Sequence, residues 1–450
     1  MPYIPHTPQD TEAMLRVIGL NSIDDLFADI PADMRPKSFA LPDGLSEYDT
    51  LRRTADLARK NSPMPTSFMG AGAYDHAVPA AVDALTARGE FYTAYTPYQP
   101  EASQGTLQGI FEYQTAVCRL LDMDVANASV YDGGTALFEA AVMCVRAAGR
   151  RRIVVDECIN PLYRAVLATL SANVHVETVT VPHRSGTSDL EALAAAVDEE
   201  CAAVLTQNPG FFGVVRDFSE LFAHARAKKA RSVLLVNPVM QAVLKTPGEM
   251  GADAAVAEGQ PLGMRLSFGG PYLGMMACTR EMVRQMPGRI VGRTTDLDGK
   301  TGYVLTLQAR EQHIRRAKAT SNICSNQALC ALRSVIHLAL LGPAGLTYAA
   351  ETAMLRAREA ADALTALRGV ELFADAPFGC EFAVTLPKAA AAVTGELLDA
   401  GIAAGVPAGL WYKGLDSVLV TACTETTAPE DVEKLAWGLS RVLNGKQGKR

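Results

Sequence analysis

The sequence lacks a long block of one charge sign, a C-x-x-C pair and any run of about 18 uncharged apolar residues. Its net charge is −7 with neither sign in a long block, so we expect no nucleic-acid partner, and without a long apolar run we expect no membrane partner. Nine scattered cysteines favour reduced, buried thiols in a cytoplasm and no metal site. Residues 1–11 carry three prolines and no apolar run, so neither a signal peptide nor a transit sequence is expected.

With 450 residues, of which 49% are hydrophobic, the chain is long enough to form two lobes. Prolines interrupt residues 1–62, which are predicted to be an N-terminal arm. Alternating strand and helix patterns predict a large domain over residues 63–335. A smaller α+β domain is predicted over residues 336–444, followed by a flexible polar tail at residues 445–450.

The spacing of apolar residues predicts individual strands and helices. The predicted strands are Ala128–Tyr131, Arg152–Asp156, His175–Val181, Ala202–Thr206, Ser232–Val236, Leu273–Cys278, Tyr303–Leu307, Glu381–Leu386 and Val418–Ala422. The predicted helices are Thr11–Leu20, Thr135–Ala148, Pro161–Ser171, Asp189–Glu199, Phe218–Lys229, Glu311–Ala319, Leu346–Leu367 and Pro429–Leu443. This alternation is typical of a mainly parallel sheet with helices on both faces.

A glycine-rich turn, residues 132–135, follows the first of these predicted strands and opens a helix. Backbone amides at a helix N-terminus attract anions, so Gly133, Gly134 and Thr135 are candidates for binding a phosphate. The alternative interpretation is a tight strand-to-helix turn in which Asp132 or Thr135 caps the helix. The short segment is compatible with both.

If that phosphate belonged to pyridoxal phosphate, a lysine in a dry pocket should follow on the same sheet. The single lysine between residues 230 and 299 is Lys245, and its neighbours Pro247 and Gly248 indicate an exposed loop. A carboxylate should also meet the pyridine nitrogen of the cofactor. The residue that ends the corresponding strand is Asn237, which cannot supply that charge.

Two further regions carry polar side chains in patterns that suggest binding. Tyrosines 92, 95 and 98 lie within seven residues beside two prolines, which indicates either a polar surface loop or a preorganised binding loop. In residues 307–327, three arginines and a lysine precede a polar, turn-prone segment. These cations indicate either a solvated helix face or a site that binds a carboxylate or phosphate. His313, in the same region, is expected on a helix surface.

A family resemblance is carried by residues 105–115, 127–129, 132–136, 207–213, 251–253, 259–263, 267–274 and 320–324. Through these segments nearly the whole chain resembles the α subunits of the split P-protein family, the glycine dehydrogenase (decarboxylating) of the glycine cleavage system. The resemblance implies an α/β fold of the fold-type-I PLP-dependent transferase class, which is aspartate-aminotransferase-like. It also implies decarboxylation of glycine with pyridoxal phosphate and transfer of the aminomethyl group to the lipoyl arm of H-protein.

The resemblance also locates the family's cofactor-binding lysine, which follows a histidine after a Gly-Ala-Asp-like or Gly-Phe-Asp-like triplet. Aligned from residues 251–253, the histidine position falls on Gln260 and the lysine position on Pro261. Proline has no amine that could bind the cofactor. We therefore expect a homologous β subunit, glycine dehydrogenase subunit 2, to hold the pyridoxal phosphate, in an α2β2 heterotetramer with this chain.

On this interpretation the chain has no catalytic residue that works alone, and it completes the active site of its partner. The candidate residues for that role are Tyr92, Thr93, Tyr95, Tyr98, Gln99, Glu101, Arg310 and Asn322. Two alternatives remain open. One is an independent fold-type-I enzyme that uses Lys245, and the other is a non-catalytic scaffold subunit.

Overall fold

The computed structural model describes residues 5–36, 38, 40–61, 66–308 and 311–445. The chain forms two compact units, Met1–Pro63 and Met64–Arg450. The predicted boundary at residues 335/336 falls inside one helix, α10 (Ala328–Thr365), so separate large and small domains stay a prediction. Apart from Gly445, the tail that was predicted to be flexible lies outside the described residues.

The described residues of the first unit form two α-helices, α1 (Pro8–Ile18) and α2 (Glu47–Ala58). Thr7 caps α1 through a capping box, and Gly19 ends it in the left-handed conformation at φ 82°. Two short 3-10 turns, Ile23–Phe27 and Ala32–Met34, lie between these helices. Many of the unit's apolar side chains are exposed on both helices and on the turns between them.

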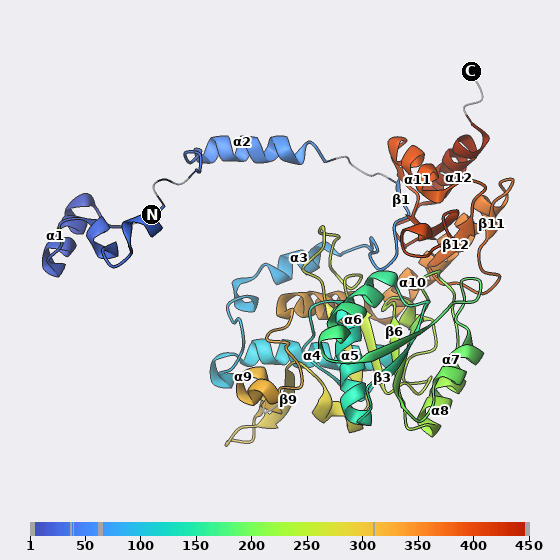
Figure 1. Ribbon diagram of the computed structural model, residues 1–450, viewed down its shortest axis with the longest axis horizontal. Coiled ribbons are helices and arrows are strands. Elements are labelled where there is room, and N and C mark those ends of the chain that lie inside the picture. The colour runs from blue at the N-terminus through green and yellow to red at the C-terminus, as the bar shows by residue number, and fades with distance from the viewer. Residues whose placement is uncertain (1–4, 37, 39, 62–65, 309–310, 446–450) are drawn as a thin grey trace. The chain divides into compact units, whose positions relative to one another are not determined.

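The second unit is built on a seven-stranded sheet with the strand order β2-β8-β7-β6-β5-β3-β4 (Figure 1). The strands β7, β6, β5, β3 and β4 run parallel, whereas β8 is antiparallel to both of its neighbours, β7 and β2. The bounds are β2 (Val125–Ala126), β3 (Arg152–Asp156), β4 (Glu177–Val181), β5 (Cys201–Asn208), β6 (Arg231–Val236), β7 (Ala254–Glu258) and β8 (Gly274–Cys278). The predicted mainly parallel sheet is confirmed.

Helices pack against both faces of this sheet and form two apolar cores with it. Ile153 and Val155 of β3 pack in one apolar core with residues of α5, while Val154 packs in a second core on the opposite face. This alternation along one strand explains why the three central residues of β3 are all apolar. The helices of this region are α4 (Gln104–Leu121), α5 (Gly133–Ala148), α6 (Pro161–Asn173), α7 (Leu190–Ala196) and α8 (Ser219–Ala227).

A second, antiparallel sheet has the strand order β11-β12-β15-β14 and packs with α11 and α12. Two smaller pairs are β1 with β13, in parallel, and the hairpin of β9 with β10. The bounds are β1 (Thr66–Ser67), β9 (Ile290–Thr295), β10 (Thr301–Thr306), β11 (Glu371–Leu372), β12 (Glu381–Thr385), β13 (Ile402–Ala403), β14 (Val406–Pro407), β15 (Val418–Ala422), α3 (Ala80–Thr86), α9 (Gln312–Arg315), α11 (Ala390–Asp399) and α12 (Pro429–Asn444).

The long helix α10 joins the cores of the two sheets. Its Ala350 and Ala353 are buried in the core of the large sheet, and Ala360 and Leu364 are buried in the core of the second sheet. The helix kinks at Gly342, where φ is 61° and ψ is −176°. By length and composition alone α10 is also apolar enough to cross a membrane. In this structure alanines let it approach both cores closely.

Two sequence predictions of elements are wrong. The strand predicted at 128–131 is displaced to β2. Val130 forms only an isolated bridge to Gly274. Ser129 interrupts the strand because its φ is 98°. The helix predicted over 311–319 is the single turn α9, followed by a 3-10 turn, because Arg316 has a φ of 53°. A positive φ in a non-glycine residue ends regular helix or strand geometry.

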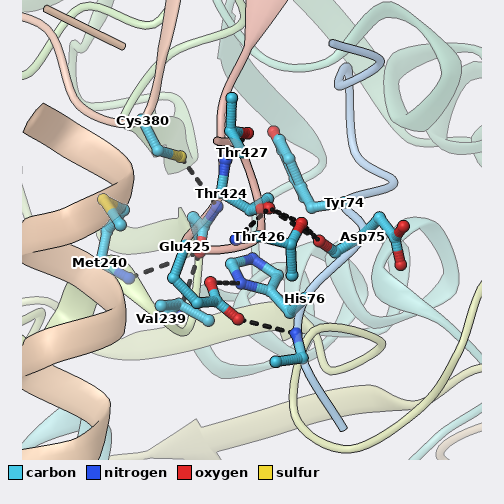
Figure 2. A network of polar contacts seen from close by, with 12 residues as sticks. Tyr74, Asp75, His76, Val239, Met240, Cys380, Thr424, Glu425, Thr426 and Thr427 are labelled. Atoms are coloured by element: carbon cyan, nitrogen blue, oxygen red, sulfur yellow. Dashed lines mark hydrogen bonds and ion pairs between the residues drawn. The ribbon is translucent and has the colours of Figure 1, made fainter. Parts of the chain in front are cut away.

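A network of polar contacts ties residues 74–77 to the loop that follows β15 (Figure 2). His76 Nδ1 lies 2.6 Å from Glu425 Oε2, and the Ala77 backbone N–H donates to Glu425 Oε1 at 2.7 Å. The Thr424 and Thr426 hydroxyls both donate to the Asp75 carbonyl. Burial tends to raise the pKa of the Glu425 carboxyl, but its bonds to His76 and Ala77 outweigh burial and lower it. The charged carboxylate therefore belongs to the folded network.

Removing this carboxylate should destabilise the fold. We expect Glu425→Ala to lower the free energy of unfolding by about 3 kcal/mol, because it leaves the buried His76 without its partner and removes the acceptor of the Ala77 N–H. Urea unfolding followed by circular dichroism measures the loss. Glu433→Ala, on the exposed face of α12, is the control and should change stability by less than about 0.5 kcal/mol. Equal effects of the two substitutions would contradict the prediction.

Candidate functional site

A cleft lies at the carboxyl ends of β5, β6 and β7, the position where parallel sheets of this kind bind ligands. Two buried carboxyl groups line it, Glu258 at the end of β7 and Glu381 at the start of β12. The remaining lining residues that bear on its chemistry are Tyr74, Asn160, Tyr163, Asn237 and Pro261. The cleft therefore combines residues from both sheets and from the chain that precedes α3.

Glu258 bonds to three backbone amides. Its Oε2 accepts from the Gly133 N–H at 2.9 Å, and its Oε1 accepts from the N–H groups of Gln260 at 2.9 Å and Leu273 at 3.1 Å. Burial raises the pKa of Glu258 to about 7, although these three bonds act to lower it. The carboxyl group thus lies directly at the first residue of α5.

The start of α5 is also capped by the preceding turn. Asp132 Oδ1 accepts from the Thr135 N–H at 2.8 Å, and the Asp132 N–H donates to Thr135 Oγ1 at 3.1 Å. This is the capping arrangement that the sequence offered as one of two interpretations. Together, Asp132 and Glu258 accept hydrogen bonds from the Gly133 and Thr135 amides in the first turn, next to Gly134.

Glu381 closes the opposite wall of the cleft. Its Oε1 accepts from the Ala71 N–H at 2.7 Å, and its Oε2 accepts from the Tyr74 hydroxyl at 3.0 Å. Burial raises the pKa of Glu381 to about 7, and burial together with the Glu381 charge raises the pKa of Tyr74. A second carboxyl group with a near-neutral pKa therefore faces the cleft.

The cleft does not fit pyridoxal phosphate. Pro261 stands where the family resemblance places the lysine, and no lysine is among the described residues that line the cleft. Asn237 supplies no charge, and its amide lies 3.7 Å from the Cys380 sulfur. Lys245 is outside the cleft, where its Nζ lies 2.9 Å from Asp217 Oδ2 in a partly exposed ion pair, as an exposed loop predicts.

The tyrosine-rich loop forms a separate surface. Tyr92, Tyr95 and Tyr98 are 60%, 80% and 48% exposed, and Thr93, Gln99 and Glu101 are exposed as well. Arg289 holds Tyr98 through two contacts. The Arg289 Nη2 donates to the Tyr98 hydroxyl at 3.2 Å, and the guanidinium lies 5.6 Å from the centroid of the Tyr98 ring. The loop thus presents one fixed tyrosine beside two that have exposed rings.

Sequence reasoning missed two residues that shape this surface, Arg289 and Gln104. Arg289 is 7% exposed and lies 4.0 Å from Glu311, so a buried cation supports the exposed ring of Tyr98. Gln104 donates to the Tyr303 carbonyl at 2.8 Å and accepts from the Tyr303 N–H at 2.9 Å, which fixes β10 to the start of α4. The position of Gln104 between a proline-rich loop and an apolar helix pattern is the sequence signal that could have revealed it.

Asn322 is exposed in a segment that packs on the turn before α5. Ser321 Oγ donates to Glu139 at 2.8 Å, and the Cys324 N–H donates to the Tyr131 hydroxyl at 3.3 Å, so the segment is anchored on both sides of Asn322. Arg310 lies outside the described residues. In the part of the chain that the structure describes, no group of three or more His, Cys, Asp and Glu side chains is arranged to hold a metal ion.

Comparison with known proteins adds independent findings. Residues 1–439 match the family model described as glycine cleavage system P-protein. A relative from Nitratidesulfovibrio vulgaris strain Hildenborough, named probable glycine dehydrogenase (decarboxylating) subunit 1, is 66% identical over 98% of this chain and 100% of the relative. A solved structure of glycine decarboxylase (P-protein) of the glycine cleavage system, in inhibitor-bound form, is 42% identical with a TM-score of 0.92, covering 98% of this chain and 100% of that chain.

More distant structures show the fold alone. Sphingosine-1-phosphate lyase from Burkholderia pseudomallei is 15% identical with a TM-score of 0.67, covering 92% of this chain and 94% of that chain. Together with the seven-stranded sheet, these similarities confirm the fold-type-I PLP-dependent transferase fold that the sequence predicted. A shared fold does not imply shared cofactor chemistry. This chain's own cleft does not fit pyridoxal phosphate.

The two buried carboxyl groups predict a pH-dependent stability. A carboxyl whose pKa rises from 4.5 to about 7 on folding holds its proton more tightly when folded, so stability falls as pH rises between these values. At about 1.4 kcal/mol per pKa unit, the Glu381 shift corresponds to on the order of 3 kcal/mol. We expect Glu381→Gln to flatten the decline in unfolding free energy between about pH 4.5 and pH 7, measured by urea unfolding. The exposed-site control Glu396→Gln should keep the wild-type slope, and an unchanged slope in Glu381→Gln would contradict the prediction.

Proposed function

The chain belongs to the glycine cleavage system P-protein family, and from this premise we propose that it acts as the α subunit of a glycine decarboxylase. In this proposal a β subunit, glycine dehydrogenase subunit 2, binds the pyridoxal phosphate, and this chain completes the β subunit's active site. The observation that carries the proposal is a cleft with Pro261 and Asn237 at the positions that the cofactor would need. The relatives' designation as subunit 1 supports a partner subunit.

The exposed aromatic and apolar residues support a large contact with that partner. Tyr92, Tyr95, Phe268 and Leu297 project from loops with much of their side chains exposed. The arm adds Val17 and Leu51 among further exposed apolar residues. Surfaces of this kind are typical of protein interfaces, in which aromatic side chains supply much of the binding energy. We propose an α2β2 assembly, because a site that is shared across an interface favours closed symmetry.

The proposed reaction removes carbon dioxide from glycine and passes the aminomethyl group to the lipoyl arm of H-protein, the co-substrate. The cofactor on the β subunit supplies the electron sink for the decarboxylation. This chain's part is to exclude water and to orient groups at the site. Because Arg289 donates to the Tyr98 oxygen, the Tyr98 hydroxyl proton remains available to a group of the partner or of the substrate.

The proposal includes a cytoplasmic location. The nine cysteines all lie among the described residues and form no disulfide, and eight of them are partly or fully buried, as thiols in reducing compartments commonly are. The two other candidate functions receive no comparable support. Lys245 is engaged with Asp217 and Ser219 at the surface, and a pure scaffold needs no tyrosine held by a buried arginine.

Activity should require both subunits. We expect the purified chain alone to release no carbon dioxide from carboxyl-labelled glycine, because its cleft has no amine to bind the cofactor. Mixing it with a β subunit, pyridoxal phosphate and lipoylated H-protein should restore the release. The β subunit alone with the same additions is the control, and it should remain at least tenfold below the mixture. Full activity of either subunit by itself would refute the division of roles.

Tyr98 should contribute through its hydroxyl. In the assembled enzyme we expect Tyr98→Phe to lower kcat for glycine decarboxylation about tenfold, since a hydrogen bond involving a charged group contributes about 1.5–3 kcal/mol. Tyr348→Phe, at an exposed position on α10, is the matched control and should leave kcat unchanged. Assembly of both variants is checked by analytical ultracentrifugation. Unchanged turnover in Tyr98→Phe with intact assembly would favour the scaffold function instead.

A further inference from the structure

We propose that Glu258 fills the anion-binding position of this chain's own cleft and so keeps pyridoxal phosphate and free phosphate out of it. This role concerns the described chain by itself and does not depend on the proposed pairing with a β subunit. It goes beyond the missing lysine, because loss of the lysine removes the covalent attachment of a cofactor but leaves a phosphate-binding helix terminus intact.

The occupied position is defined by the first turn of α5. Glu258 Oε2 lies 2.9 Å from the Gly133 nitrogen, which is the distance at which a phosphate oxygen would accept the same bond. The neighbouring Thr135 N–H is already bonded to Asp132 at 2.8 Å. A bound phosphate would have to displace one or both carboxylates from these amides.

The start of α5 packs directly against the residue that carries the Glu258 carboxyl. A Cβ added at Gly133 would lie 2.9 Å from the Glu258 Cβ and 3.1 Å from its backbone nitrogen, so the helix start and the end of β7 are in direct contact. The same carboxyl is held on its other side by the Gln260 and Leu273 amides. Glu258 is buried and cannot swing away without breaking three hydrogen bonds.

Negative charge also disfavours the binding of a phosphate at the start of α5. The Asp132 and Glu258 carboxyl groups are close enough that the Asp132 charge raises the Glu258 pKa, after the larger effect of burial. A phosphate that enters beside these groups would add like charge to a buried region, which is unfavourable. Glu258 thus places an internal carboxyl group, in place of an external anion, at the positive end of the helix.

Substitution of Glu258 should open the position. We expect Glu258→Ala, in the full chain, to bind inorganic phosphate and pyridoxal phosphate at least tenfold more tightly than the wild type, measured by isothermal titration calorimetry. Hydrogen exchange of the peptide that covers the start of α5 should slow on adding phosphate to this variant, but not to the wild type. Glu258→Gln removes the charge but keeps the side-chain volume, so it should gain less affinity than Glu258→Ala.

Glu381→Ala is the matched control, because Glu381 is equally buried in the cleft but bonds to Ala71 and Tyr74 instead of α5. If Glu258→Ala does not fold, Glu258→Ser tests the same opening with a smaller loss of contacts. The proposal is overturned if the wild type binds phosphate at the start of α5 as tightly as the opened variant. It is also overturned if a folded Ala or Ser variant gains no affinity, or if Glu381→Ala gains as much.

Discussion

A carboxyl group at the junction of β7 and α5 is the constraint on which the cleft of this protein depends. Glu258 joins the end of a parallel strand, the start of a helix and the approach to β8 through three backbone hydrogen bonds. A helix start beside a strand end usually offers its amides to a ligand. In this chain those amides bond to the protein's own carboxyl groups. The fold therefore keeps its architecture without the cofactor chemistry that it commonly supports.

The wall opposite Glu258 follows the same principle. Glu381 bonds to the Ala71 amide and the Tyr74 hydroxyl, and the nearby Glu425 bonds to His76 and Ala77 (Figure 2). The carboxyl groups of β12 and of the loop after β15 therefore hold the segment before α3 at the cleft. The polar surface that remains accessible is the tyrosine loop, where the buried Arg289 fixes Tyr98. Structural rigidity in the cleft and exposed aromatic residues outside it are consistent with a subunit that serves a partner.

Sequence patterns predicted the elements whose side chains follow a simple period. The strands at 152–156 and 418–422 have the expected bounds, and Pro429 and the acidic residues after it mark α12. The strand β7 was missed because its residues are mostly alanines, which do not distinguish a strand from a helix. Backbone conformation caused the errors at residues 128–131 and 311–319, since the positive φ angles of Ser129 and Arg316 have no signal in residue type.

The sequence by itself determined which chemistry is absent at the site. Pro261 has no amine and Asn237 has no charge, and these are properties of the side chains wherever they lie. Only the tertiary structure decided what replaces that chemistry, because Glu258 meets Gly133 across 125 residues of chain and Arg289 meets Tyr98 across 191. Such pairs are set by the order and register of the strands, which bring distant residues together without leaving a local pattern in the sequence.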